Sequence, residues 1–192
     1  MATVAAKLLT AEEFAEFVLR PENLDRIFEL ERGEVVEMPR PGKEHGMVCA
    51  NIARILGNYA VAQNRGYVCS NDTGIIVERD PDTVRGPDVM FFDDDNERED
   101  VEKKWGETPP LLAAEVLSPN DKIGKVHRRI EQQLDFGTAL VWLVDPESMI
   151  VTVFRRNRQH FVLGSGDEIS GEDVLPDFQC LVAEFFRKPR KS

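Results

Sequence analysis

The sequence is poor in cysteine and has no hydrophobic run that could cross a membrane. Its three cysteines, Cys49, Cys69 and Cys180, form no close pair, which argues against a structural zinc site and favours a reducing compartment. The N-terminal segment is too short and too polar for a signal peptide. Because a membrane-spanning helix needs about 20 apolar residues, we expect a cytoplasmic protein that makes no membrane contact.

Several common catalytic and nucleotide-binding motifs are also missing. The sequence has no Gly-rich phosphate loop, no dinucleotide-binding fingerprint and no Gly-x-Ser-x-Gly nucleophile motif. Its three histidines, His45, His127 and His160, lack the spacing of a zinc site. The function must therefore depend on residues outside these motifs.

The composition is that of an ordinary globular protein, with 42% hydrophobic and 31% charged residues in a chain of 192. We expect a single domain over residues 1–192, with its core at about 8–186. The net charge of −11 is uneven, because residues 93–102 hold seven acids and one arginine. We expect an acidic surface loop at 93–108 and a basic tail at 187–192, so the overall charge weighs only mildly against a nucleic-acid substrate.

Local patterns predict a mixed α+β fold with helices packed on one β-sheet and a β-hairpin towards each end. Thr10 and Glu13 form a capping-box pattern, and apolar residues recur at helical spacing from about 43 to 63. The expected helices cover about 11–19, 43–63, 120 or 121 to 136, and 182–186. The expected strands cover the hairpin 28–38, then 67–70, 74–78, 88–92, 111–117 and 140–144, then the hairpin of 150–154 and 159–163.

The strongest signal for a functional site is Glu115, the only charged residue in the apolar run 111–117. A buried carboxylate needs a partner, so Glu115 is either a ligand for a hard divalent cation or half of a structural pair with an arginine. Asp88 follows Pro87 and begins the apolar run 88–92, so it lies either in a polar turn or at the edge of a cleft. Two carboxylates at neighbouring strand positions would form a minimal Mg²⁺ site.

The predicted helix after Glu115, capped by Asn120 or Asp121, carries a row of polar side chains. At about 100° per residue, this row lies on one side of the helix. It consists of Lys122, Lys125, Arg129 and Gln133. Ile123, Ile130 and Leu134 fall on the adjacent side, which we expect to pack on the sheet. The polar row either neutralises a scissile phosphate or is a solvated charged face.

Two further residues are weaker candidates for the site. His45, at the start of the long predicted helix, is either a base or phosphate donor, or a satisfied polar residue near the helix start. Glu34, in the first predicted hairpin, is either a site acid or an ordinary exposed strand residue.

Six segments carry a resemblance to a known family. They are 33–38 (GEVVEM), 44–46 (EHG), 72–74 (DTG), 85–89 (RGPDV), 110–119 (PLLAAEVLSP) and 137–146 (GTALVWLVDP). With them the chain resembles, over roughly residues 8–186, the Uma2 family (DUF820) of restriction-endonuclease-like proteins. That resemblance implies the PD-(D/E)XK nuclease superfamily, with a restriction-endonuclease-like mixed sheet, flanking helices, a divalent metal and phosphodiester hydrolysis. It also suggests a homodimer.

The resemblance assigns metal-binding roles residue by residue. Asp88 matches the aspartate of the PD element, and Glu115 matches the second acid. These two residues, with the Val116 carbonyl, would bind Mg²⁺ or Mn²⁺. The superfamily lysine would stand two residues after the second acid, where this chain has Leu117.

In the Uma2 family that lysine is thought to lie on the following helix, at the position of Arg129 here, with an aromatic residue one turn later at the position of Gln133. Both residues depart from the family pattern. Arginine can stabilise phosphate charge but cannot lose its proton to act as a base. Lys122 or Lys125 would be the substitute cation.

The expected function is therefore metal-dependent hydrolysis of nucleic-acid phosphodiester bonds, with DNA as the expected substrate. The alternative is a catalytically weakened module with the same fold that binds nucleic acid or a protein partner. Hydrolysis of another phosphoester is a third possibility, because a fold does not fix a function.

Overall fold

The computed structural model describes residues 7–94, 101 and 104–188. The helices are α1 (Ala11–Val18), α2 (Lys43–Gln63) and α3 (Ile123–Phe136), with short 3₁₀ helices at Pro21–Asn23 and Val182–Phe185. The strands are β1 (Ile27–Glu31), β2 (Glu34–Met38), β3 (Tyr67–Ser70), β4 (Ile75–Glu78), β5 (Thr83–Arg85), β6 (Val89–Phe92), β7 (Leu112–Val116), β8 (Leu140–Asp145), β9 (Ile150–Phe154), β10 (Phe161–Gly164), β11 (Glu168–Gly171) and β12 (Leu175–Leu181). This arrangement confirms the mixed α+β class.

The largest sheet has six strands in the order β10-β9-β8-β7-β6-β3. β7 and β8 run parallel, and the other neighbouring pairs are antiparallel. β7 lies inside the sheet, and all five of its residues are buried, as its short apolar sequence predicts.

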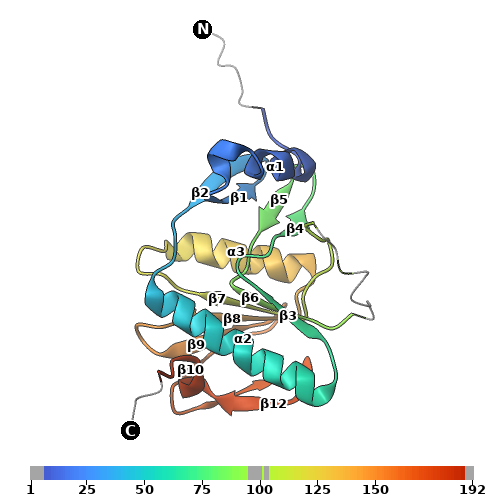
Figure 1. Cartoon of the computed structure of the whole chain (residues 1–192). Coiled ribbons are helices and arrows are strands. Elements are labelled where there is room, and N and C mark those ends of the chain that lie inside the picture. The colour runs from blue at the N-terminus through green and yellow to red at the C-terminus, as the bar shows by residue number, and fades with distance from the viewer. Residues whose placement is uncertain (1–6, 95–100, 102–103, 189–192) are drawn as a thin grey trace.

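The two long helices cover opposite faces of this sheet (Figure 1). Ile52 of α2 packs in a cluster with Trp142, whereas Ile130 of α3 packs in a cluster with Val141 and Leu143. Successive residues of a strand point to opposite faces, so this alternation along β8 places the helices on different sides. α2 covers Lys43–Gln63, the full range that the hydrophobic pattern predicts.

A second sheet, with the order β2-β1-β5-β4, forms the N-terminal end of the molecule (Figure 1). α1 packs on it through Phe14, which is fully buried beside Leu30. The predicted capping box is present, because Thr10 accepts a hydrogen bond from the Glu13 amide and the Glu13 side chain accepts one from the Thr10 amide. The predicted N-terminal hairpin is also present, with β1 and β2 paired antiparallel.

The structure corrects the expectation of one sheet. β4 pairs with β5 in the four-stranded sheet, while its neighbour in sequence, β3, pairs with β6 in the six-stranded sheet. The sequence patterns did not predict β5, β11 and β12. β11 and β12 form a third sheet, which packs against the hydrophobic core through Ile169 and Phe178. The predicted hairpin of β9 and β10 is confirmed.

The start of α3 also differs from the prediction. The N-cap is Lys122, without a capping side-chain hydrogen bond, and Asp121 instead accepts a hydrogen bond from the Ser118 amide at 2.8 Å. Ile123 is 58% exposed and does not pack on the sheet, whereas Ile130 is buried as expected.

Two predicted segments lie partly outside the described residues. The proposed acidic loop at 93–108 includes residues 95–100 and 102–103, and the basic tail at 187–192 includes residues 189–192. Among the described helices, none combines the length and the apolar character needed to cross a bilayer.

Candidate functional site

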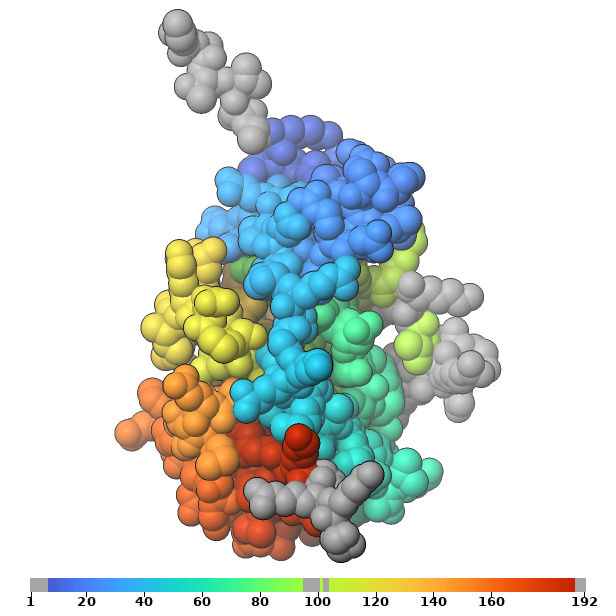
Figure 2. Space-filling view, turned by 60° about the vertical axis from the view of Figure 1, so that its left-hand side comes forward, coloured from blue at the N-terminus to red at the C-terminus, as the bar shows by residue number. Residues whose placement is uncertain are grey.

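A cleft of about 470 Å³ is lined by residues of both larger sheets and of the two long helices. Its lining includes Glu29 of β1, Arg85 of β5, His45 of α2 and Arg129 of α3. In Figure 2 the light-blue segment 38–45, which contributes to this lining, crosses the face of the molecule from the N-terminal sheet to α2. Asp88, Glu115 and Val116 also line the cleft, so the structure brings the predicted acid pair together.

Strand pairing places the two acids at the same edge of the sheet. Val89 pairs with Ala114 between β6 and β7, and continuing this register by one residue sets Asp88 opposite Glu115. Asp88 Oδ2 accepts a hydrogen bond of 2.7 Å from the Val116 amide. This bond fixes the Asp88 carboxylate beside β7, and its other oxygen, Oδ1, faces the ring of His45.

Glu115 is almost completely buried, with 5% of its surface exposed. Its Oε2 lies 3.6 Å from the guanidinium of Arg129, and its Oε1 accepts a hydrogen bond from the Gln133 amide. Burial raises the pKa of Glu115 to about 8; Arg129 opposes this rise, and the charge of Asp88 adds to it. The arginine partner is therefore present, and Glu115 also lines the cleft; its role as a metal ligand stays a prediction.

Arg129 and Gln133 lie one turn apart on α3 and face the acid pair. Burial lowers the pKa of Arg129, but the carboxylates of Glu115 and Glu29 outweigh it, so the net pKa is raised and the cation is retained. Arg129 Nε and Gln133 Oε1 are buried without a hydrogen-bond partner within the described part of the chain. Buried polar atoms usually have partners, so these two mark a place where a ligand or water would be accommodated.

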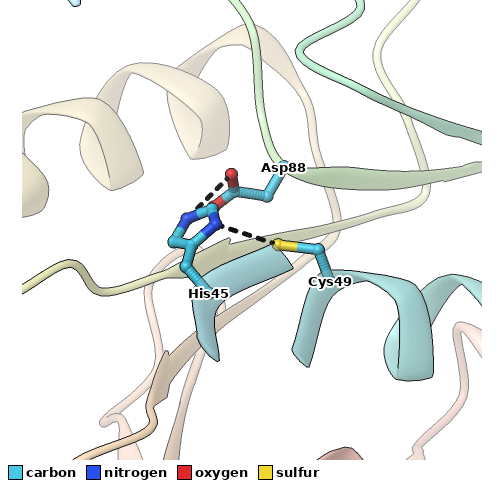
Figure 3. Close-up of side chains that lie close together, drawn as sticks. All are labelled: His45, Cys49 and Asp88. Atoms are coloured by element: carbon cyan, nitrogen blue, oxygen red, sulfur yellow. Dashed lines mark hydrogen bonds and ion pairs between the residues drawn. The ribbon is translucent and has the colours of Figure 1, made fainter. Parts of the chain in front are cut away.

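His45 links α2 to the acid pair (Figure 3). Its Nε2 lies 3.2 Å from Asp88 Oδ1, and its Nδ1 lies 3.4 Å from the sulfur of Cys49, one helical turn later. The hydrogen bond to Asp88 raises the pKa of His45. Burial and the charges of Asp88 and Asp72 raise the pKa of the Cys49 thiol. Cys49 was not predicted as a site residue, although its spacing from His45 on the helix was a usable signal.

A buried polar network connects the second sheet to α3. Arg85 forms a 2.9 Å ion pair with Glu29 and donates two hydrogen bonds, of 3.0 and 2.8 Å, to the side chain of Gln132. Gln132 in turn donates a 3.1 Å hydrogen bond to Glu78. The network holds the helix that carries Arg129 against β1 and β5, and sequence patterns did not reveal it because its members are far apart in the chain.

The remaining predicted residues are exposed and lie outside the lining of the cleft. Lys122 and Lys125 are exposed at the start of α3, and neither lines the cleft. Glu34 is exposed on β2 and is also outside the lining. The acid from this hairpin that does line the cleft is Glu29, on β1.

Comparison with known proteins gives a family and a fold. The model of the family described as "Uma2: Putative restriction endonuclease" matches residues 11–183. A crystal structure of "a putative nuclease belonging to DUF820" from Anabaena variabilis ATCC 29413 is similar with a TM-score of 0.78. It is 20% identical, and the match covers 93% of this chain and 97% of that one, which shows a shared fold. No curated protein matches the chain.

Proposed function

Because this chain belongs to the Uma2 family of putative restriction endonucleases, we propose that it is a metal-dependent nuclease that hydrolyses phosphodiester bonds in nucleic acid. The observation that carries the proposal is the convergence of Asp88, Glu115 and Arg129 in one cleft. Two acids and a retained cation are the groups needed to hold a divalent ion and to balance the charge of a phosphate.

The donor set at the acid pair fits a hard cation such as Mg²⁺ or Mn²⁺. Asp88 and Glu115 offer carboxylate oxygens, which these ions prefer, and we propose the Val116 carbonyl as a third ligand. The unpartnered Gln133 Oε1 adds a buried acceptor beside Glu115. A bound ion would polarise the scissile phosphate and favour attack by water.

The protein's own residues would position this chemistry. The Val116 amide and the His45 ring hold the Asp88 carboxylate from two sides. Arg129 would move its guanidinium from Glu115 to the phosphate and stabilise the charge that develops during cleavage, because arginine remains protonated. Removal of a proton from the attacking water would then fall to another group, since Arg129 cannot serve as a base.

A catalytically weakened binding module is the second candidate function. Arg129 and Gln133 both engage Glu115, so they occupy a carboxylate that a metal ion would need. If these contacts persist with substrate present, the cleft would bind nucleic acid or a protein partner without cleaving it. The nuclease and the binding module therefore differ in whether Glu115 releases Arg129 and binds a metal ion instead.

We propose DNA as the substrate, the cytoplasm as the site of action and a homodimer as the working form. Cleavage assays with Mg²⁺ or Mn²⁺ on single- and double-stranded DNA and RNA test the activity, with Asp88→Ala as the control. The proposal expects metal-dependent cleavage that Asp88→Ala abolishes. Cleavage that survives this change, or binding without cleavage on all four substrates, would reject it. Sedimentation or light scattering on the same sample measures the oligomeric state.

A further inference from the structure

Three side chains of different chemistry meet at the edge of the cleft: His45, Cys49 and Asp88 (Figure 3). One possible metal-ligand atom from each lies within 4.8 Å of the other two. Within the described ranges, no other group of three or more His, Cys, Asp or Glu side chains meets this condition. Glu115, the second acid of the proposed nuclease site, is not a member of this group.

The three side chains lie close enough together to share a small ion once they rotate. His45 Nε2 lies 3.2 Å from Asp88 Oδ1, and His45 Nδ1 lies 3.4 Å from Cys49 Sγ. Tetrahedral zinc, with bonds of about 2.0 Å to nitrogen or oxygen and about 2.3 Å to sulfur, needs ligand atoms about 3.3–3.6 Å apart. The two ring nitrogens now face different partners, so binding one ion requires the side chains to rotate until both partners meet the same nitrogen.

The helix supplies two of the ligands at a favourable spacing. His45 and Cys49 are four residues apart in α2 and therefore lie on the same face, one turn above the other. The same i, i+4 spacing places two histidines on one zinc ion in metalloprotease helices. Val48 and Ile52 of α2 are fully buried against the six-stranded sheet, so this face of the helix is held in place.

The charge around the thiol favours a dication. The carboxylates of Asp88, Asp72 and Glu115 all act on the position of the Cys49 sulfur. Their negative charge attracts a divalent ion, and the ion would bind Cys49 as a thiolate after displacing the thiol proton.

We propose that His45, Cys49 and Asp88 form a second metal site, selective for Zn²⁺ over Mg²⁺, with water completing the coordination. Thiolate and imidazole ligands suit zinc, whereas Mg²⁺ prefers oxygen ligands alone. Three protein ligands and one open position are the arrangement of a reactive or exchangeable zinc site rather than a closed structural one. Because Asp88 belongs to both sites, zinc would compete with the catalytic ion, a consequence that rests on the proposed nuclease function.

Cobalt absorption tests the site on the full chain without nucleic acid. The protein is stripped of metal with a chelator and titrated with Co²⁺, whose bond to a thiolate gives strong charge-transfer absorption in the near ultraviolet. We expect this band to saturate at one ion per chain, to disappear when Zn²⁺ is added, and to resist a hundredfold excess of Mg²⁺. Absence of the band in the wild-type chain would overturn the proposal.

Variants identify the ligands. Cys49→Ser should abolish the cobalt band and weaken Zn²⁺ binding at least tenfold, whereas Cys180→Ser, at another half-buried thiol on β12, should leave both unchanged. A band that survives Cys49→Ser, or one that Cys180→Ser also removes, would refute the assignment. Glu115→Gln should keep the band, which separates this site from the acid pair proposed for cleavage.

A measurement on the wild-type chain covers the case in which Cys49→Ser fails to fold. Alkylation of each cysteine is followed by peptide mass spectrometry with and without Zn²⁺. Zinc should slow modification of Cys49 and leave Cys69 and Cys180 unaffected; equal rates at Cys49 would overturn the proposal. If zinc protects Cys49 but the protein cleaves no nucleic acid, only the nuclease proposal is rejected. If the protein cleaves nucleic acid but zinc does not protect Cys49, only the zinc site is rejected.

Discussion

The guanidinium of Arg129 lies 3.6 Å from the carboxylate of Glu115, so the cation that would meet a phosphate is paired with an acid that would hold the metal. The pair is nearly buried on the Glu115 side and partly buried on the Arg129 side. Binding of the metal ion and the substrate would therefore have to separate Arg129 from Glu115. Metal affinity, the effect of pH and the cleavage rate should all depend on this separation.

Metal binding by the acid pair is the first prediction. Asp88→Asn or Glu115→Gln should weaken Mn²⁺ binding at the oxygen-ligand site by at least tenfold, because hard cations depend on the number of carboxylates. Calorimetric titration of the chain, with Cys49→Ser as the background to remove thiolate binding, measures this. Glu34→Gln is the matched control, since Glu34 is exposed on β2 and outside the cleft. Wild-type affinity in both acid variants would place the ion elsewhere.

The second prediction concerns pH and the stability of the metal-free chain. Burial raises the pKa of Glu115 above that of an unfolded glutamate, so between the two values the folded state holds a proton that the unfolded state lacks. The stability that Glu115 gives the folded chain in its protonated form is complete below the pKa of an unfolded glutamate. It is lost as the pH rises towards about 8. In excess chelator, the unfolding free energy should fall by up to about 1.4 kcal/mol per pH unit from this group.

Urea unfolding of wild type and Glu115→Gln across pH 5–8 isolates this effect. Glutamine does not titrate, so the unfolding free energy of wild type minus that of Glu115→Gln should decrease steadily as the pH rises. A constant difference at all pH values would show that Glu115 is ionised throughout, held by Arg129.

The buried pair of Arg85 and Glu29 gives the third prediction. Arg85→Met should destabilise the fold by about 3–5 kcal/mol, because it leaves Glu29 charged and buried without its partner. Arg128→Ala is the control: Arg128 pairs with Glu31 at 3.2 Å but is 64% exposed, and exposed pairs contribute only about 0–1 kcal/mol. Equal losses in the two variants, measured by denaturant unfolding, would contradict the role given to the network.

The parts of the fold that depend on local sequence were predictable. The Thr10–Glu13 capping box, the apolar spacing along α2 and the apolar run of β7 each determine an element within a few residues. The N-cap of α3 was not, because Asp121 forms its bond with the Ser118 amide rather than with the helix. The four-stranded sheet was missed because β5 has only three residues, too few for a pattern.

The candidate site also has features that local sequence predicts and contacts that it does not predict. The burial of Glu115 could be inferred from its strand, whereas the turn before β6 left two alternatives for Asp88, of which the structure shows the cleft position. The contacts of His45 with Asp88, and of Arg85 with Glu29, join segments that are distant in the chain. A single sequence holds no record of such pairings, so only the fold could supply them.

The fourth prediction asks what Arg129 does in cleavage. If the cation only stabilises phosphate charge, Arg129→Lys should keep the rate within about tenfold, equivalent to roughly 1.4 kcal/mol of barrier. If the position must also take a proton or orient water at close range, the wild type should be nearly inactive, and Arg129→Lys should raise the rate by about 10²–10⁴-fold. We expect the first result, with weak but measurable wild-type activity.

Single-turnover cleavage of a labelled oligonucleotide in Mn²⁺ measures these rates. Arg128→Lys is the matched control, because its side chain points to Glu31 and solvent rather than to the acid pair. Lys122→Ala and Lys125→Ala test whether an exposed lysine substitutes for the missing one; a large loss in either would move the cation from Arg129 to that residue. If none of these proteins cleaves and the chain still binds nucleic acid or a protein without metal, the nuclease proposal fails and the binding module is favoured.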